Sequence, residues 1–354
     1  MRKFTGFSLV CILLCARIFA TLTFFPNHME SGLAYGIGAV ISTLLQGILL
    51  IPAARLAQLC PEGPCKAAMD KHRTLGTAVT VCFMLYFMYE AFVDAGSMAY
   101  FTDYFFSVNM HRALTALCCT LAAVYLARLD TAVIGRTAQI AFFGMVGLIL
   151  MMALCSAASL DIMRLDLAVE RPFEVIGRAV ISETERCECL VLFTFLAGRS
   201  QSSPQKSARH FLIAKGTLVG GLFILVTAAL GAFGMRTKLP VFALASYSKN
   251  LITERSDAVF LLVWVFMGIV KLGVLIHCAA ECLRLLFPKV DKMKSSLFCG
   301  VLPAFCALPL LLSYKWERII CSEHSLVSVV GMSVIIPLIL LSRPAAASHS
   351  KAAA

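Results

Sequence analysis

Apolar stretches about as long as a bilayer is thick recur along the whole chain. The hydrocarbon core of a membrane is about 30 Å thick, and a helix needs about 20 apolar residues to cross it. Of the 354 residues, 60% are hydrophobic and only 14% are charged, a composition that excludes a water-soluble fold of this length. The sequence therefore predicts an all-α, polytopic membrane protein. We expect ten transmembrane helices, near residues 5–25, 34–56, 75–100, 113–127, 132–158, 181–199, 210–234, 257–285, 296–313 and 325–342.

The loops between these segments differ in charge on the two sides of the expected bundle. On the side of the amino terminus, bases such as Arg2, Arg199, Lys289 and Arg343 far outnumber acids, whereas bases and acids balance on the other side. Loops rich in Lys and Arg stay in the cytoplasm. The pattern predicts that both termini are cytoplasmic. We therefore expect the net charge of +11 to reflect bases that hold loops in the cytoplasm rather than a nucleic-acid binding surface.

The expected helices divide into two groups of five. An odd number of spans in each half forces the halves into opposite orientations, which is the inverted-repeat plan of many secondary transporters. The chain is then divided into a first five-helix repeat at 1–158, an external loop with a short surface helix at 159–180, a second repeat at 181–342, and a low-complexity, disordered tail at 343–354.

Ionised side chains also occur at membrane depth, where each costs several kcal/mol unless it is paired. Lys215 and Glu281 lie close to cytoplasmic helix ends, and we expect both to reach solvent. The others either tie helices together as structural ion pairs or line a polar cavity on a ligand path. We favour the cavity, because short polar side chains accompany the charges. The ten residues are Arg17, Arg136, Arg186, Lys215, Lys271, Glu90, Asp94, Glu185, Glu188 and Glu281.

The first, third, sixth and eighth expected helices carry charges of this set. Glu90 and Asp94 are four residues apart, so their carboxylates share one face of the third helix. Arg17 and Lys271 lie near the midplane of the first and eighth helices, and the segment 181–198 opens the sixth with several charges. The candidate ligand-binding residues are Arg17, Thr21, Glu90, Asp94, Glu185, Arg186, Glu188 and Lys271.

The sequence contains no motif of a known catalytic or cofactor site. It has no H-E-x-x-H, no G-x-S-x-G and no phosphate-binding loop. Most of the fifteen cysteines lie in apolar runs, where cysteine packs as a small hydrophobe. Cys60 and Cys65 share a loop but lack a second ligand pair for zinc. We expect no enzymatic activity, no cofactor and no metal.

Several segments resemble a known family. They are LLQGILLIPAARLAQLCP, YLARLDTAVIGRTAQI, ECLVLFTFLAG and RSDAVFLLVWVFMGIVKLGVLIHCAAECLRLLF. On these the chain resembles the spore germination permeases, the membrane-embedded subunits of germinant receptors and a branch of the amino acid/polyamine/organocation transporter superfamily. Asp257, Trp264, Lys271 and Glu188 fall on residues typical of the family. The chain departs from it where CARIFAT and TERCE replace the usual helix-breaking residues of the first and sixth spans.

The resemblance implies a LeuT-like fold and a subunit in the spore inner membrane. It implies that a small nutrient such as an amino acid binds between helices 1, 3, 6 and 8, and that a large membrane subunit and a lipoprotein are partners. By analogy with the fold, the first and sixth helices would be broken, Arg17 would pair with Glu188, and Lys271 would pair with Glu90 or Asp94. A proton- or cation-coupled amino acid or amine transporter and a purely structural membrane partner are the alternatives.

Overall fold

The computed structural model describes residues 4–23, 31–106, 112–165, 171–237, 239–247, 256–312 and 326–342. Within these residues all regular secondary structure is helical, apart from one isolated bridge between Phe4 and Ser200. Seven of the described helices are long and apolar enough to cross a membrane. They are α1 (Gly6–Thr23), α2 (Gly32–Leu59), α4 (Arg73–Phe106), α6 (Thr131–Ser156), α9 (Pro204–Leu230), α12 (Ser256–Leu286) and α13 (Lys292–Leu312). The expectation of an all-helical fold is confirmed.

Shorter elements occupy the other expected spans. Helix α5 (Arg112–Ala127) lies at the fourth span, and the tenth consists of α15 (Leu326–Val330), the π-helical turn η4 (Gly331–Ile335) and α16 (Ile336–Ser342). The sixth is formed by two short helices, α7 (Pro172–Glu185) and α8 (Cys189–Leu196). The remaining elements are α3 (Pro64–Lys71), η1 (Ala157–Ser159), η2 (Ile162–Arg164), η3 (Ala197–Arg199), α10 (Ala232–Arg236) and α11 (Pro240–Tyr247).

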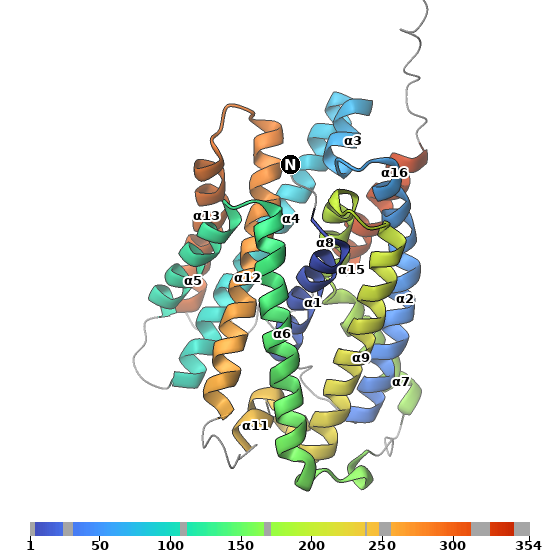
Figure 1. Ribbon diagram of the computed structural model, residues 1–354, viewed down its shortest axis with the longest axis vertical. Coiled ribbons are helices and arrows are strands. Elements are labelled where there is room, and N and C mark those ends of the chain that lie inside the picture. The colour runs from blue at the N-terminus through green and yellow to red at the C-terminus, as the bar shows by residue number, and fades with distance from the viewer. Residues whose placement is uncertain are drawn as a thin grey trace, which may run out of the picture.

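Helix α1 is the centre of the bundle. Its side chains are buried apart from that of Phe7, and it packs against α6, α8, α9 and α12. In Figure 1 it runs between α2 and α9 on one side and α6 and α12 on the other. Because neighbouring helices cover it on all sides, α1 faces neither the lipid nor the solvent along most of its length. Arg17, in the middle of α1, is therefore held away from both water and lipid.

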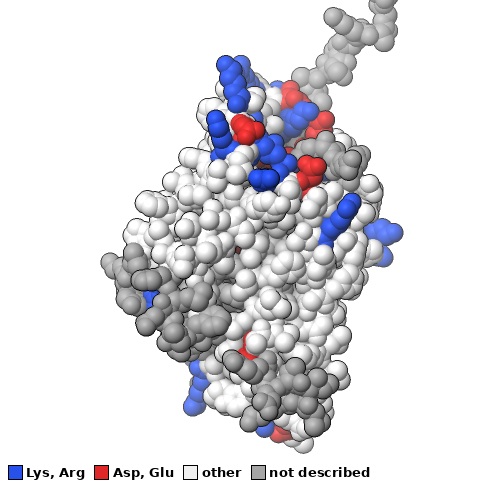
Figure 2. Space-filling model, turned by 60° about the vertical axis from the view of Figure 1, so that its left-hand side comes forward, with Lys and Arg blue, Asp and Glu red and all other residues white. Residues whose placement is uncertain are grey.

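The outer surface is that of a membrane protein. Large apolar side chains such as Leu44 and Ile48 on α2 and Leu154 on α6 are exposed, where lipid would cover them. Figure 2 shows the charged side chains gathered mainly at one end of the molecule, while the face over its middle is nearly uncharged. An uncharged band between charged ends is what a bilayer requires.

Two features differ from the sequence-based expectations. Helix α7 begins at Pro172, inside the stretch expected to form an external loop with a surface helix, and it continues to Glu185 as part of the bundle. Its close contact with α2 depends on Gly38, where an added Cβ would lie 2.5 Å from the Cβ of Ala179. The expected break in the first helix is absent from the described residues, because α1 is continuous from Gly6 to Thr23. The expected disordered tail at 343–354 lies outside the described residues.

Candidate functional site

The helix break between α7 and α8 lies beside the centre of α1. At the end of α7, the N–H of Arg186 donates to the carbonyls of Ser182 and Thr184, and that of Cys187 donates to Thr184. Among the described residues, the N–H groups of Glu188 and Cys189 have no acceptor. A helix start with free N–H groups carries partial positive charge and favours an anionic partner. The expected break in the sixth span is confirmed.

One side of the break forms an acidic cluster, which we define as Glu90, Asp94, Glu188 and Lys271. The Nζ atom of Lys271 lies 2.8 Å from Oδ1 of Asp94 and 2.6 Å from Oε1 of Glu188. All four side chains are buried, and they come from α4, the break and α12. The cluster thus holds three carboxyl groups and a single ammonium group.

The carboxyl groups of this cluster are incompletely satisfied. Oε2 of Glu90, Oδ2 of Asp94 and Oε1 of Glu188 accept no hydrogen bond from any described residue, although Oε1 of Glu188 is in ion-pair contact with Lys271. Glu90 lies one turn before Asp94 and interacts electrostatically with Glu188 and Lys271. Buried carboxylate oxygens without donors are costly. The acidic cluster can therefore accept an additional cationic or hydrogen-bond-donating group.

The other side of the break forms a basic cluster, which we define as Arg17, Glu183, Lys215 and Gln46. Arg17 pairs with Glu183 and donates to Oγ1 of Thr21 at 2.9 Å. Lys215 donates to Oε1 of Gln46 at 2.7 Å and lies 3.9 Å from Glu183. All four members of the cluster are buried, and Nε of Arg17 has no acceptor among the described residues. Two cations thus share one carboxylate.

Helix α2 connects the basic cluster to the break. Gln46 donates to Oγ of Ser42 at 2.9 Å and to the carbonyl of Glu183 at 3.3 Å, and Ser42 bonds to Thr184 at 2.9 Å. Cys187 donates its thiol to Oε1 of Gln46. These bonds hold the end of α7 against α2, so that Glu183 faces α1 while Glu188 faces α12.

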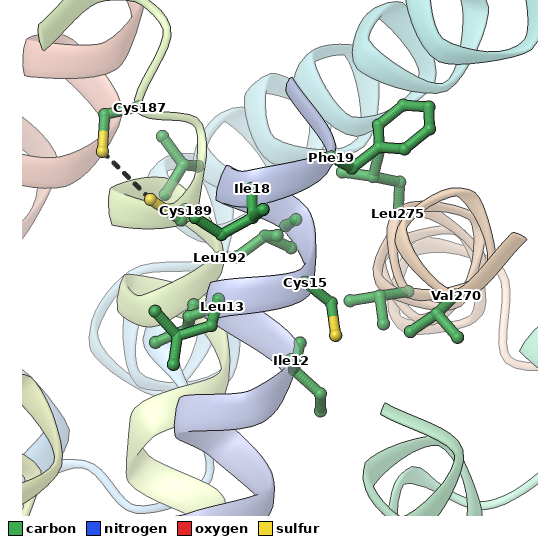
Figure 3. Close-up of a cluster of buried hydrophobic side chains, with 14 of the residues drawn as sticks. Ile12, Leu13, Cys15, Ile18, Phe19, Cys187, Cys189, Leu192, Val270 and Leu275 are labelled. Carbon is green, nitrogen blue, oxygen red and sulfur yellow. Dashed lines mark hydrogen bonds between the residues drawn. The ribbon is translucent and has the colours of Figure 1, made fainter. Parts of the chain in front are cut away.

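An aromatic group covers the acidic cluster on one side. The Trp264 ring stacks on Phe19 with centroids 5.4 Å apart, contacts Phe101 at 5.8 Å, and donates from Nε1 to Thr23 at 2.9 Å. Trp264 lies about two helical turns from Lys271 on α12, and Nζ of Lys271 lies 5.4 Å from the centroid of Phe19. Figure 3 shows α1 with the break on one side and Val270 and Leu275 of α12 on the other.

An ion pair closes the opposite end of this region. Arg199 of η3 pairs with Glu281 of α12 and lies over the ring of Phe195 at 5.0 Å. Glu281 follows Lys271 by ten residues, about 15 Å along a helix. It was expected to reach solvent, but it is buried because Arg199 covers it. The clusters are thus enclosed between an aromatic group and an ion pair.

The structure brings most of the sequence-predicted residues together. Arg17 and Thr21 lie at the basic cluster, and Glu90, Asp94, Glu188 and Lys271 form the acidic one. Glu185 and Arg186 are half-buried at the break, where Arg186 is close enough to interact electrostatically with Glu183. The expected pair of Lys271 with Asp94 is present. The expected pair of Arg17 with Glu188 is wrong, since Arg17 pairs with Glu183 and Glu188 pairs with Lys271.

Sequence reasoning missed three members of the basic cluster. Glu183 was assigned to the outer loop charges because the helix was expected to start only two residues earlier. Lys215 was expected to reach solvent, but it is fully buried on α9, where Gln46 and Glu183 face it. Gln46 carried a usable signal, as it is a lone amide inside the apolar run of α2. Arg136, by contrast, is exposed on α6.

Comparisons with known proteins agree with this architecture. A family model described as "Spore germination protein" matches residues 4–313. Among solved structures, the transporter MhsT in complex with L-phenylalanine superimposes with a TM-score of 0.58 at 11% sequence identity, covering 96% of this chain and 99% of that one. No curated protein sequence matches the chain. The fold is thus that of a LeuT-type transporter, and the molecule is a multi-pass integral membrane protein.

Proposed function

The chain belongs to the spore germination protein family, and from that premise we propose that it is the ligand-binding membrane subunit of a germinant receptor. The ligand is a small zwitterionic nutrient, an amino acid. It binds at the break between α7 and α8, where α1, α4 and α12 converge, and its arrival is signalled to a large membrane subunit and a lipoprotein in the spore inner membrane.

This proposal rests on the charges on the two sides of the break, which are unbalanced in opposite directions. The acidic cluster has three carboxyl groups for one ammonium, and the basic cluster has two cations for one carboxylate. An amino acid would place its ammonium group against Glu90 and Asp94 and its carboxylate toward Arg17. It adds no net charge to a membrane interior, where a lone ion would be costly.

The free N–H groups at the start of α8 support the same orientation. The N–H groups of Glu188, a member of the acidic cluster, and of Cys189, which follows it, have no acceptor among the described residues. Backbone N–H groups at the amino end of a half-helix are a common means of binding an anionic substrate group in transporters with broken helices. A carboxylate there would receive hydrogen bonds without requiring another charged side chain.

The enclosure of the site suggests how binding could be signalled. A ligand shifts a conformational equilibrium only by its differential affinity for the two states. An ammonium group that competes with Lys271 for Glu188 would weaken the link between the break and α12. Helix α8, which ends next to the Arg199–Glu281 pair, would transmit that change to the cytoplasmic end. We also propose the finer topology expected from the sequence, with ten spans in a 5+5 inverted repeat and both termini cytoplasmic.

The proposal is tested by equilibrium binding to the purified protein in lipid nanodiscs. A labelled amino acid should bind saturably, and unlabelled amino acids should displace it. The corresponding amino alcohol, which lacks the carboxylate, and the desamino acid, which lacks the ammonium group, should compete at least about tenfold less well, because each leaves one cluster without its partner. Displacement by either analogue as strong as that by the amino acid would oppose a zwitterion site.

A second candidate is a secondary amino acid or amine transporter, which the fold shared with MhsT favours. Uptake by proteoliposomes distinguishes the two functions. Concentrative uptake of the labelled amino acid by this chain alone, driven by a proton or sodium gradient, would favour the transporter. Saturable binding without uptake would favour the receptor subunit.

A further inference from the structure

Two cysteines lie on either side of Glu188 at the helix break. The Sγ atoms of Cys187 and Cys189 are 3.0 Å apart, and both side chains are completely buried. Figure 3 shows the two thiols pointing toward each other beside α1. The proposed ligand contacts neither thiol, although Cys187 helps to hold the break through Gln46.

Cys187 is buried beside two cations of the basic cluster. The charges of Lys215 and Arg17 both act on this sulfur, and its thiol donates to Oε1 of Gln46 at 3.0 Å. Cations near a thiol stabilise the thiolate, which is the form that attacks peroxides and disulfides. The pair therefore places one thiol near two cations and a second thiol 3.0 Å away, where it can resolve an oxidised sulfur.

We infer that Cys187 and Cys189 form a reversible disulfide when the membrane is exposed to a hydroperoxide. The Cys187 thiolate attacks one oxygen of hydrogen peroxide, the O–O bond breaks, and the departing hydroxide takes up a proton to leave a sulfenic acid and water. The Cys189 sulfur then displaces the sulfenic hydroxyl, which leaves as a second water. Two thiols are oxidised and one peroxide is reduced, and a dithiol such as dithiothreitol reverses the reaction.

Forming the bond requires the two sulfurs to move closer together. A disulfide is about 2.05 Å long, so the sulfurs need to approach by about 1 Å. The Cys187 sulfur lies before the first residue of α8, where the regular helical hydrogen bonds are interrupted. Closing the ring would fix the backbone on both sides of Glu188. The inference does not depend on the proposed ligand, because it concerns only the two thiols and the break.

Trypsin isolates this pair for mass spectrometry. Cleavage after Arg186 and Arg199 releases residues 187–199, whose only cysteines are Cys187 and Cys189. The protein in nanodiscs is treated with hydrogen peroxide, denatured, alkylated with iodoacetamide and digested. We expect peptide 187–199 from the oxidised protein to carry no alkyl group. Its mass should be lower by two hydrogen atoms than that of the reduced, unalkylated peptide. Dithiothreitol before alkylation should restore both alkyl groups.

Three variants and a second readout make the test decisive. Cys187→Ser and Cys189→Ser should each leave the remaining cysteine unable to form this bond, whereas Cys299→Ser, on α13, should behave like the wild type. Hydrogen exchange of the amides around the break should slow on oxidation in the wild type and not in Cys189→Ser. If both cysteines in the peptide remain fully alkylated, or Cys187 stops at a sulfinic acid, the inference is overturned.

Discussion

Lys271 on α12 and Glu188 at the helix break are in ion-pair contact, with 2.6 Å between Nζ and Oε1, and both are buried. The contact joins the break to the middle of α12. Because Lys271 also binds Asp94 on α4, one ammonium group holds three separate parts of the chain together. Its loss would leave three carboxyl groups in the same buried space.

Lys271→Met should therefore destabilise the protein strongly, by about 3–5 kcal/mol, as expected when one partner of a buried ion pair is removed. Adding Glu188→Gln to this variant should recover part of the loss, because it removes one of the uncompensated carboxyl groups. Thermal unfolding in detergent measures both effects, with the exposed Lys289→Met as control. Equal stability of the single variant and the wild type would contradict the role given to this pair.

Glu183→Gln should be the most damaging single change in the basic cluster. It leaves Arg17 and Lys215 buried without a carboxylate, and an unpaired buried charge costs several kcal/mol. Lys215→Met added to Glu183→Gln should raise the unfolding temperature above that of the single variant, since one of the two cations is then removed. Glu62→Gln, on an exposed side chain, is the matched control. A further loss of stability in the double variant would argue against mutual compensation.

Gly268 tests the close packing around the aromatic group. An added Cβ would lie 2.7 Å from Cε of Met98 and 2.7 Å from Cε2 of Phe19. Gly268→Ala should destabilise by about 1–3 kcal/mol through overpacking. Gly147→Ala on α6 is the control, because its Cβ would meet no atom within 4 Å, and it should be neutral or stabilising by up to about 1 kcal/mol. If the two variants unfold at the same temperature, α12 can shift away from α1 to make room for the added methyl group.

Two substitutions of Trp264 separate the contribution of ring packing to stability from that of the hydrogen bond to Thr23. Trp264→Phe keeps a ring between Phe19 and Phe101 but loses the bond to Thr23, at a cost of about 1 kcal/mol for the bond plus that of the smaller ring. Trp264→Ala also removes the ring contacts and should cost about 3–5 kcal/mol. Chemical denaturation in mixed micelles ranks the two variants. If Trp264→Phe is less stable than Trp264→Ala, the ring is not packed as described.

The sequence was sufficient to predict the membrane class, the helical fold and most of the charged centre. Those features follow from apolar run lengths and from charges that cannot face lipid, as with Glu90, Asp94 and Lys271. Ion-pair partners were harder to predict, because Glu183 and Glu188 lie only five residues apart and the break turns them toward different helices. The start of α7 at Pro172 also escaped prediction, since that segment is amphipathic and its buried face meets α2 through Gly38 and Ala179.

Glu90 offers the most direct test of the zwitterion site. Its carboxyl group forms no ion pair within the described residues, and its Oε2 atom accepts no hydrogen bond there, so Glu90→Gln replaces the carboxyl group by an amide of the same size with little effect on the internal pairs. Calorimetric titration should show amino acid binding weakened about tenfold or more, as for loss of a hydrogen bond to a charged group, with the weak binding of the desamino acid unchanged. Unchanged amino acid affinity, or an equal loss for both ligands, would contradict an ammonium group bound at the acidic cluster.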